Sequence, residues 1–387
     1  MGGVSMEWKE DVLGNVLEVK YGKDHKKLAD GQYPVYGSGG LMRYVDSKLY
    51  DGPSILIPRK GTLNNIMFVE SPFWTVDTMF WSIINTDKVD PKFLFYSICK
   101  RDFASMNVGS AVPSMTVNIL NDIQISYPKN IEDQRRIASI LSSLDRKIEL
   151  NNKINADLEE MAQAIFKNWF VDFEPFKGGK FVDSELGMIP EGWKVGRADD
   201  FYQINIGKTP PRKENKWFST NPADKIWVSI ANMGNSGIFI SDSSEYLTKE
   251  AVDRHNIIMV PRNTILLSFK LTVGRVAIAD KELTTNEAIA RFILSDDKYM
   301  EYLYLYLKNF DYNSLGSTSS IATAVNSKTI KGMQMLQPSD KIIDAFHIQV
   351  NPIFEKIRSL TKENSRLSLL RDTLLPRLMS GELEVPE

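Results

Sequence analysis

The sequence predicts an α/β (α+β) protein in which two similar globular domains are separated by two long helices. The helices are expected to pair as an antiparallel coiled coil, with the two domains related by an approximate two-fold axis. Three observations lead to this prediction. The chain repeats itself once at a period of about 210 residues, far longer than the period of a solenoid. Each copy ends in a long heptad pattern. At 387 residues, the chain also exceeds the length that one hydrophobic core usually serves.

The internal repeat rests on an ordered series of matches. The segment ILIPRKGTLNNIMFVESPFWTVDTMFWSII at 55–84 aligns without gaps with ILLSFKLTVGRVAIADKELTTNEAIARFIL at 265–294, and Lys60 falls on Lys270. Few residues are identical, but the apolar positions coincide closely, and further matches follow in the same order on both sides. Short β-branched and aromatic runs alternate with turn residues in both copies, which is typical of strands. Each copy is therefore expected to fold as a globular α/β unit.

Two heptad stretches predict the long helices. Residues 137–165 and 346–374 carry apolar side chains at alternating steps of four and three, which is the seam of a coiled coil. Asn155 and Asn364 occupy equivalent seam positions, where a buried polar residue fixes register at some cost in stability. Pro352 lies inside the second stretch and predicts that this helix begins or kinks there.

These patterns divide the chain into four segments. The first globular domain is expected at 1–130, and the central helix with the start of a linker at 131–177. The rest of the linker and the second globular domain follow at 178–339, and the C-terminal helix at 340–387. The linker is indicated by the Gly- and Pro-containing run FEPFKGGKFVDSELGMIPEGWK.

Composition narrows the function classes. The single cysteine, Cys99, excludes a disulfide framework and favours a reducing cytoplasm, and no stretch is apolar for long enough to span a bilayer. The three histidines are not at metal-ligand spacing, so no metal site is expected. A net charge of −2 argues against a simple basic DNA-binding domain, but it leaves room for a local basic face.

Three short motifs partly match known catalytic motifs, and each lacks a residue or a context that the chemistry requires. The run Asn351-Pro352-Ile353-Phe354 lacks the second proline of the amino-methyltransferase motif and lies inside the heptad pattern. Glu18-Val19-Lys20 has the tail of a nuclease motif without a partner aspartate. The loop at 37–40 lacks the lysine and hydroxyl residue of a phosphate-binding loop. We therefore expect no catalytic residues.

Three further segments carry a family resemblance. They are QRRIASILSSLDRKIELNNKINADLEEMAQAIFKNWFVDFEPF from Gln134, MIPEGWKVGRADDF from Met188 and LRDTLLPRLMSGELEV from Leu370. Together with the double organisation, they resemble the specificity subunits of type I restriction–modification systems over nearly the whole chain. The resemblance implies a non-catalytic, cytoplasmic subunit whose two globular domains are target-recognition domains, each of which reads one half of a bipartite double-stranded DNA site.

The resemblance also implies partners. Two modification subunits would methylate adenine from S-adenosylmethionine, and restriction subunits would cleave DNA with ATP. These partners, and not this chain, would bind S-adenosylmethionine, ATP and Mg²⁺. Trp169 and Phe170 end the first helix, where they could contact a modification subunit or simply pack in the core. Two rival interpretations are a DNA-free coiled-coil scaffold that spaces two interaction domains, and a fused type II enzyme fragment, which the missing methyltransferase motifs disfavour.

Candidate DNA contacts come from basic clusters that recur at matched positions in the two copies. Lysine and arginine there could neutralise phosphates, and hydroxyls could position the backbone, whereas the plain alternative for any one of them is ordinary surface charge. The candidates in the first copy are Lys20, Lys23, Lys26, Lys27, Ser38, Arg59 and Lys60. Those in the second copy are Lys208, Thr209, Arg212, Lys213, Lys216, Lys270, Arg275 and Ser317.

Overall fold

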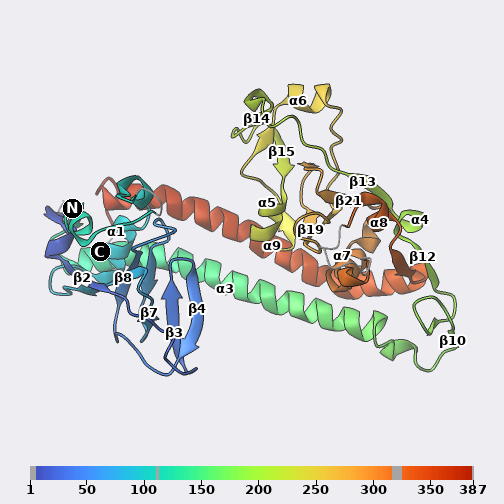
Figure 1. Cartoon of the computed structure of the whole chain (residues 1–387), viewed down its shortest axis with the longest axis horizontal. Helices are drawn as coiled ribbons and strands as arrows, with labels where there is room; N and C mark the ends of the chain where they lie inside the picture. The colour runs from blue at the N-terminus through green and yellow to red at the C-terminus, as the bar shows by residue number, and fades with distance from the viewer. Residues whose placement is uncertain (1–5, 110–112, 316–324, 386–387) are drawn as a thin grey trace, which may run out of the picture. The chain divides into compact units, whose positions relative to one another are not determined.

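The computed structural model describes residues 6–109, 113–315 and 325–385. The chain forms two compact units: unit 1 comprises Met1–Glu149 with Ser365–Glu387, and unit 2 comprises Leu150–Asn364. Each unit combines β-sheets and short helices with parts of the two long helices α3 (Ile131–Phe170) and α9 (Asp340–Met379) (Figure 1). The predicted α/β class, with two repeated domains and two long helices, is confirmed.

Unit 1 is built on a four-stranded sheet of order β2-β8-β5-β6 and a three-stranded sheet of order β4-β3-β7. β5 (Ser54–Pro58) is buried at every position, which is why its sequence SILIP is almost entirely apolar instead of alternating. It pairs antiparallel with β8 (Met79–Ile84). The other elements are β1 (Trp8–Val12), β2 (Leu17–Tyr21), β3 (Tyr33–Gly37), β4 (Gly40–Val45), β6 (Met67–Val69), β7 (Trp74–Thr75), β9 (Gln124–Pro128), α1 (Pro91–Ile98) and α2 (Val117–Asn121).

Unit 2 holds a five-stranded sheet of order β13-β21-β18-β19-β16 and a four-stranded sheet of order β14-β17-β15-β20. Its strands are β10 (Phe181–Val182), β11 (Ile189–Pro190), β12 (Lys194–Arg197), β13 (Gln203–Ile206), β14 (Phe218–Ser219), β15 (Lys225–Val228), β16 (Phe239–Ile240), β17 (Tyr246–Leu247), β18 (Ile265–Ser268), β19 (Val276–Ala279), β20 (Thr284–Thr285), β21 (Ile289–Ile293) and β22 (Gln334–Gln337). Its short helices are α4 (Ala198–Phe201), α5 (Ile230–Asn235), α6 (Lys249–Arg254), α7 (Met300–Asn309) and α8 (Ser327–Lys331).

The repeat seen in the sequence is a repeat of structure. β5, β7 and β8 of unit 1 correspond in the alignment to β18, β20 and β21 of unit 2. The pairing agrees as well: β5 and β8 are antiparallel neighbours, as are β18 and β21. β7 pairs in parallel with β3, and β20 pairs in parallel with β15. The matched apolar positions therefore fill equivalent strands in two separate cores.

The seam residues of α3 and α9 are core residues of each unit. In unit 1, Leu141 of α3 is buried in the hydrophobic cluster against which Leu374 of α9 packs. In unit 2, Ala162 of α3 shares a cluster with Ile357 of α9. Full burial of one aliphatic or aromatic side chain contributes about 1.5–3 kcal/mol, so the long helices are held by the domains they pass through. The structure thus assigns part of each helix to each unit, whereas the sequence patterns set the helices apart as segments of their own.

The two long helices run antiparallel within each unit. In unit 1, Arg371 of α9 donates to Asp145 of α3 at 2.7 Å. In unit 2, the side-chain amide of Asn151 donates to Asn364 at 2.9 Å. Asn364 therefore pairs with Asn151 rather than with its sequence equivalent Asn155, because an antiparallel pair brings together residues at a constant sum of numbers.

Pro352 was predicted to begin or to kink the helix; α9 begins at Asp340, which excludes a helix start at Pro352, and a kink there stays a prediction. The proline lacks an N–H and cannot bond the carbonyl of Ile348. Ile348 is exposed, which leaves water free to satisfy that carbonyl. Among the helices described, none is long and apolar enough to cross a membrane.

Candidate nucleic-acid interface

A glycine–lysine turn follows β2 in unit 1 and is held by the buried scaffold. The backbone N–H of Lys23 donates to the carbonyl of Thr75 at 2.9 Å, and the indole of Trp74 donates to the carbonyl of Lys23 at 2.9 Å. A Cβ added to Gly22 would lie 2.0 Å from the carbonyl oxygen of Val76. Only glycine fits at that approach, and the turn presents the Lys23 side chain to solvent.

The same turn follows β13 in unit 2. The N–H of Lys208 donates to the carbonyl of Thr285 at 2.9 Å, and the indole of Trp227 donates to the carbonyl of Lys208 at 3.3 Å. A Cβ added to Gly207 would lie 1.9 Å from the carbonyl oxygen of Asn286. The two units therefore fix the backbone of an exposed lysine at matched positions, through equivalent bonds to Thr75 and Thr285 and through an indole donor that comes from β7 in unit 1 and from β15 in unit 2.

Unit 1 gathers several predicted contact residues near its turn. The Arg59 guanidinium lies 5.2 Å from the ring centre of Tyr21, the last residue of β2. Arg59 is followed by the exposed Lys60 and by Gly61, and a Cβ on Gly61 would meet the Ser38 hydroxyl at 2.9 Å. The loop that contains Ser38 and the loop at 59–61 thus lie together, as an interface of mixed cationic and hydroxyl groups requires.

The other lysines of unit 1 are less constrained. Lys20 forms an ion pair with Glu18 on the same strand, which offsets part of its charge. Lys26 and Lys27 are exposed in the loop that follows the Gly22–Lys23 turn. Their positions fit phosphate contacts and fit ordinary surface charge equally well.

Arg212 of unit 2 is held in one orientation. Its two terminal nitrogens donate to the carboxylate of Glu245 at 2.7 and 3.0 Å. The guanidinium lies 4.1 Å from the ring centre of Phe218 and 4.5 Å from that of Trp227. The hydrogen bond to Glu245 raises the pKa of Arg212, and the same bond lowers the pKa of the Glu245 carboxyl. Because both groups are partly exposed, the pair contributes about 0–1 kcal/mol, but it fixes a planar donor group in a defined direction.

An acidic residue lies among the predicted contacts of unit 2. Thr209 donates a hydrogen bond to the carboxylate of Glu287. Burial opposes ionisation of Glu287, but the Thr209 bond and the positive charges of Lys270 and Arg212 lower the pKa of its carboxyl. Glu287 aligns with Asp77 of unit 1, so both units place a carboxylate near their basic residues.

The remaining lysines of unit 2 differ in their surroundings. The ammonium of Lys208 donates to the carbonyl of His255 at 2.6 Å. Lys216 lies 4.3 Å over the ring of Trp217, whereas Lys213 is exposed. Of these three side chains, Lys213 is therefore the one most available to a phosphate.

Arg275 is half-buried and has a structural partner. Its guanidinium donates to the carbonyl of Ile230 at 2.7 Å and fills the space beside Gly234, where an added Cβ would lie 2.3 Å from it. This bond braces α5, which weakens the case for a direct DNA contact. Ser317 lies outside the described residues.

A sequence model of the family described as "Type I restriction modification DNA specificity domain" matches residues 6–160 and 190–347. The chain belongs to this family. The type I restriction enzyme HindI specificity subunit of Haemophilus influenzae is 28% identical, over 82% of this chain and 83% of that protein. The MjaIX specificity subunit of Methanocaldococcus jannaschii is 30% identical, over 94% and 86%. A solved type I S subunit from M. genitalium is 14% identical and covers 100% of this chain and 98% of that one with a TM-score of 0.62, which shows a shared fold.

The chain is thus a specificity subunit of a type I restriction–modification system and not one of the catalytic subunits. The described part of this specificity subunit contains no group of three or more His, Cys, Asp or Glu residues that could hold a metal ion.

Sequence reasoning missed several residues of the candidate interface. Tyr21 is 54% exposed and stacks on Arg59, and the acidic partners Glu245 and Glu287 orient Arg212 and Thr209. The alignment offered one signal, because it places Glu287 opposite Asp77. The partnership of Arg212 with Glu245 joins residues far apart in sequence and carries no local signal.

Phe170 is a core residue of the specificity subunit. Its ring lies 4.8 Å from those of Tyr302 and Phe346, and its side chain is 4% exposed. Burial favours the packing alternative over contact with a modification subunit. Trp169 is half-buried against Phe346, so a partner contact there stays a prediction.

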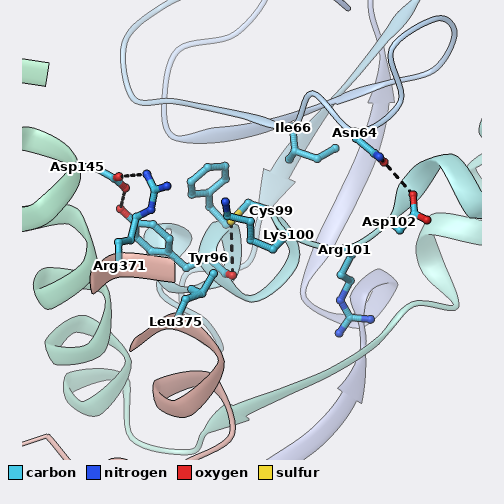
Figure 2. A pocket seen from close by; sticks show the side chains of 11 residues that line it. Asn64, Ile66, Tyr96, Cys99, Lys100, Arg101, Asp102, Asp145, Arg371 and Leu375 are labelled. Atoms are coloured by element: carbon cyan, nitrogen blue, oxygen red, sulfur yellow. Dashed lines mark hydrogen bonds and ion pairs between the residues drawn. The ribbon is translucent and has the colours of Figure 1, made fainter. Parts of the chain in front are cut away.

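The pocket of Figure 2 lies in unit 1 and has a cavity volume of about 460 Å³. Asp145 of α3 joins its walls, because it accepts hydrogen bonds from Tyr96 of α1 at 2.5 Å and from Arg371 of α9 at 2.7 Å. Burial raises the pKa of the neighbouring Cys99 thiol to about 11, so the thiol is protonated and inert at neutral pH. The polar side chains of this pocket therefore connect α1, α3 and α9 by hydrogen bonds. Its cysteine is not an activated nucleophile of the kind that a catalytic site requires.

Proposed function

We propose that this specificity subunit reads a bipartite double-stranded DNA site, with one half-site bound by each unit. The observation that carries the proposal is the pair of matched turns at Gly22–Lys23 and Gly207–Lys208, each of which holds an exposed lysine rigidly at the edge of its own sheet. Repeated units with separate cores support independent reading of two half-sites.

Both units contain side chains suited to phosphate contacts and side chains suited to base contacts. Exposed lysines supply charge that neutralises phosphates, which gives affinity without sequence preference. Residues held in fixed orientations, such as Arg212 on Glu245 and Arg59 on Tyr21, are suited to hydrogen bonds with base edges, because direction decides which base is accepted. Neighbouring carboxylates at Asp77 and Glu287 disfavour binding of DNA in other orientations by charge repulsion.

We further propose that α3 and α9 set the spacing of the half-sites and offer a docking surface for two modification subunits and for restriction subunits. Each helix has 40 residues, a rise of about 60 Å. S-adenosylmethionine, ATP and Mg²⁺ would then be bound by those partners, in the cytoplasm. This part of the proposal rests on family membership.

The test is methylation-site sequencing of a host that expresses this chain with its cognate modification subunit. We expect methylated adenines in a motif of two defined half-sites separated by a spacer of fixed length and undefined sequence. The control is the same host with the modification subunit alone, which should leave the motif unmethylated. A single contiguous motif, or methylation that does not depend on this chain, would overturn the proposal and favour the scaffold alternative.

A further inference from the structure

Leu271 of unit 2 is 99% exposed, more than any other large hydrophobic side chain in the described residues. It belongs to none of the hydrophobic clusters of its unit. A leucine placed entirely in water contributes nothing to folding by burial. Its side chain therefore has no packing role in the isolated chain.

The backbone holds Leu271 outward in a strained turn. The N–H of Thr272 donates to the carbonyl of Lys270 at 2.7 Å, which closes a three-residue turn around Leu271. The φ of Leu271 is 61°, a left-handed value that a leucine adopts at a cost in free energy. The buried hydroxyl of Ser268 donates to the carbonyl of Thr272 at 2.5 Å and accepts from the N–H of Arg275 at 3.0 Å. These bonds fix the turn at both ends.

The matched position in unit 1 shows that the turn itself does not need leucine. Gly61 aligns with Leu271 and has a φ of 89°. Glycine adopts such values without strain. A side chain on Gly61 would collide with Ser38, whereas the side chain of Leu271 points into open solvent. Unit 2 therefore carries leucine at a left-handed position where glycine would cost less free energy. The gain that offsets this cost must come from the leucine side chain.

Leu271 lies next to the candidate interface of unit 2. The exposed Lys270 precedes it, and the charge of Lys270 acts on Glu287, the partner of Thr209. The N–H of Phe269 donates to the carbonyl of Ala288 at 2.9 Å, which ties the start of the turn to the residue after Glu287. An apolar tip beside cations is suited to the DNA major groove, which is bordered by phosphates and presents the thymine methyl group among its hydrogen-bonding groups.

We propose that Leu271 is a specificity residue that contacts the C5-methyl group of a thymine in the half-site read by unit 2. This methyl is the apolar group that base pairs present in the major groove. The inference rests on the proposed reading of DNA by this chain. The hydrogen bonds of the turn fix the backbone of Leu271 before DNA arrives, so little backbone entropy is lost on contact. Unit 1 has glycine at this place, so the contact belongs to one half-site only.

The test compares Leu271→Gly with the parent chain, each in complex with its modification subunits, on duplexes that carry the mapped site. Glycine suits the left-handed turn, so we expect an unfolding midpoint at or above that of the parent. Preference at one base pair of one half-site should fall about 4-fold, as expected for loss of one buried methyl contact, with the other half-site unchanged. The slope of affinity against salt should stay the same, because no charge is removed. Met188→Ala, which removes an exposed apolar side chain from the linker, is the control and should change neither preference.

A second arm identifies the group contacted. Replacing that thymine by uracil, which lacks the methyl, should weaken parental binding as Leu271→Gly does and should have no further effect on the variant. If uracil is neutral for the parent but Leu271→Gly changes DNA bending, the leucine is a wedge between bases, and the methyl contact is wrong. Full parental preference in Leu271→Gly, or an equal loss on all sequences, also overturns the inference. Absence of any bipartite preference in the parent would instead remove the proposed function.

Discussion

At the residue scale, the candidate interface depends on two backbone positions, Gly22 and Gly207, where only glycine fits. Gly22 and Gly207 each pass a carbonyl oxygen at a distance that excludes a Cβ, and the lysine that follows is fixed by its own N–H and carbonyl. Both lysine side chains are exposed, and that of Lys208 also donates to the carbonyl of His255. Each position thus combines a fixed backbone with an exposed positive charge, which suits contact with a phosphate.

Lys213 and Arg212 should respond differently to mutation. We expect Lys213→Ala to weaken DNA binding on all sequences and to reduce the salt slope by about one unit, because one exposed charge is lost. Arg212→Ala should in addition reduce preference at one base pair, because Arg212 is oriented by Glu245, Phe218 and Trp227.

The measurement is affinity of the assembled complex for cognate and scrambled duplexes over a range of salt concentrations. Lys180→Ala, an exposed lysine in the linker, serves as the control and should leave the slope unchanged. Parental affinity and slope for Lys213→Ala would assign that lysine to ordinary surface charge.

At the element scale, two polar seam residues of α3, Asn151 and Asn155, differ in the hydrogen bonds that they donate to α9. Asn151 is fully buried, and its amide donates to Glu363 at 2.8 Å and to Asn364 at 2.9 Å. Asn364 in turn donates to Asn152 at 2.8 Å. The side-chain oxygens of Asn151 and Asn155 are both buried without a hydrogen-bond partner among the described residues, so the two residues differ in the amide bonds that Asn151 donates across to α9. We therefore assign the register within unit 2 to these bonds of Asn151.

Asn151→Leu and Asn155→Leu should separate these roles. Replacing Asn151 removes its two hydrogen bonds to Asn364 and Glu363, so we expect a loss of about 1–3 kcal/mol in the free energy of unfolding. Replacing Asn155 removes an unsatisfied oxygen and adds apolar surface to a seam, so stability should be unchanged or higher. The free energy of unfolding of each variant is measured by urea unfolding of the full chain, monitored by circular dichroism. Equal losses in the two variants would contradict the assignment of register to Asn151.

Features that depend on neighbouring residues in the sequence were predictable, whereas contacts between residues far apart in the sequence were not. Periodic apolar positions report burial locally, so the strands around Ile55 and Ile265 and the long helices were predictable. Partners across helices and loops are not local. The pairing of Asn364 with Asn151 follows from antiparallel geometry, and the bond of Arg275 to Ile230 joins distant segments, so neither could be read from spacing.

At the scale of the whole molecule, α3 and α9 each pass from one unit into the other. The boundary falls after Glu149 in α3 and after Asn364 in α9. Each unit has its own antiparallel contact between the helices, Asp145 with Arg371 in unit 1 and Asn151 with Asn364 in unit 2. The two contacts flank the boundary, so a length change made there leaves both of them intact.

This arrangement gives a direct test of the proposal that the helices set the spacer. Inserting one heptad after Glu149 and another after Asn364 preserves the seam period and adds about 10 Å of rise to each helix. We expect the methylated motif to keep both half-sites and to gain about three base pairs of spacer, at roughly 3.4 Å each. Activity should fall somewhat, because the added length also rotates one half-site about the duplex axis. An insertion in one helix only should misalign the seam and lower the unfolding midpoint.

Methylation-site sequencing compares the parent, the double insertion and both single insertions. An active double insertion that keeps the parental spacer would mean that α3 and α9 do not measure the distance between half-sites.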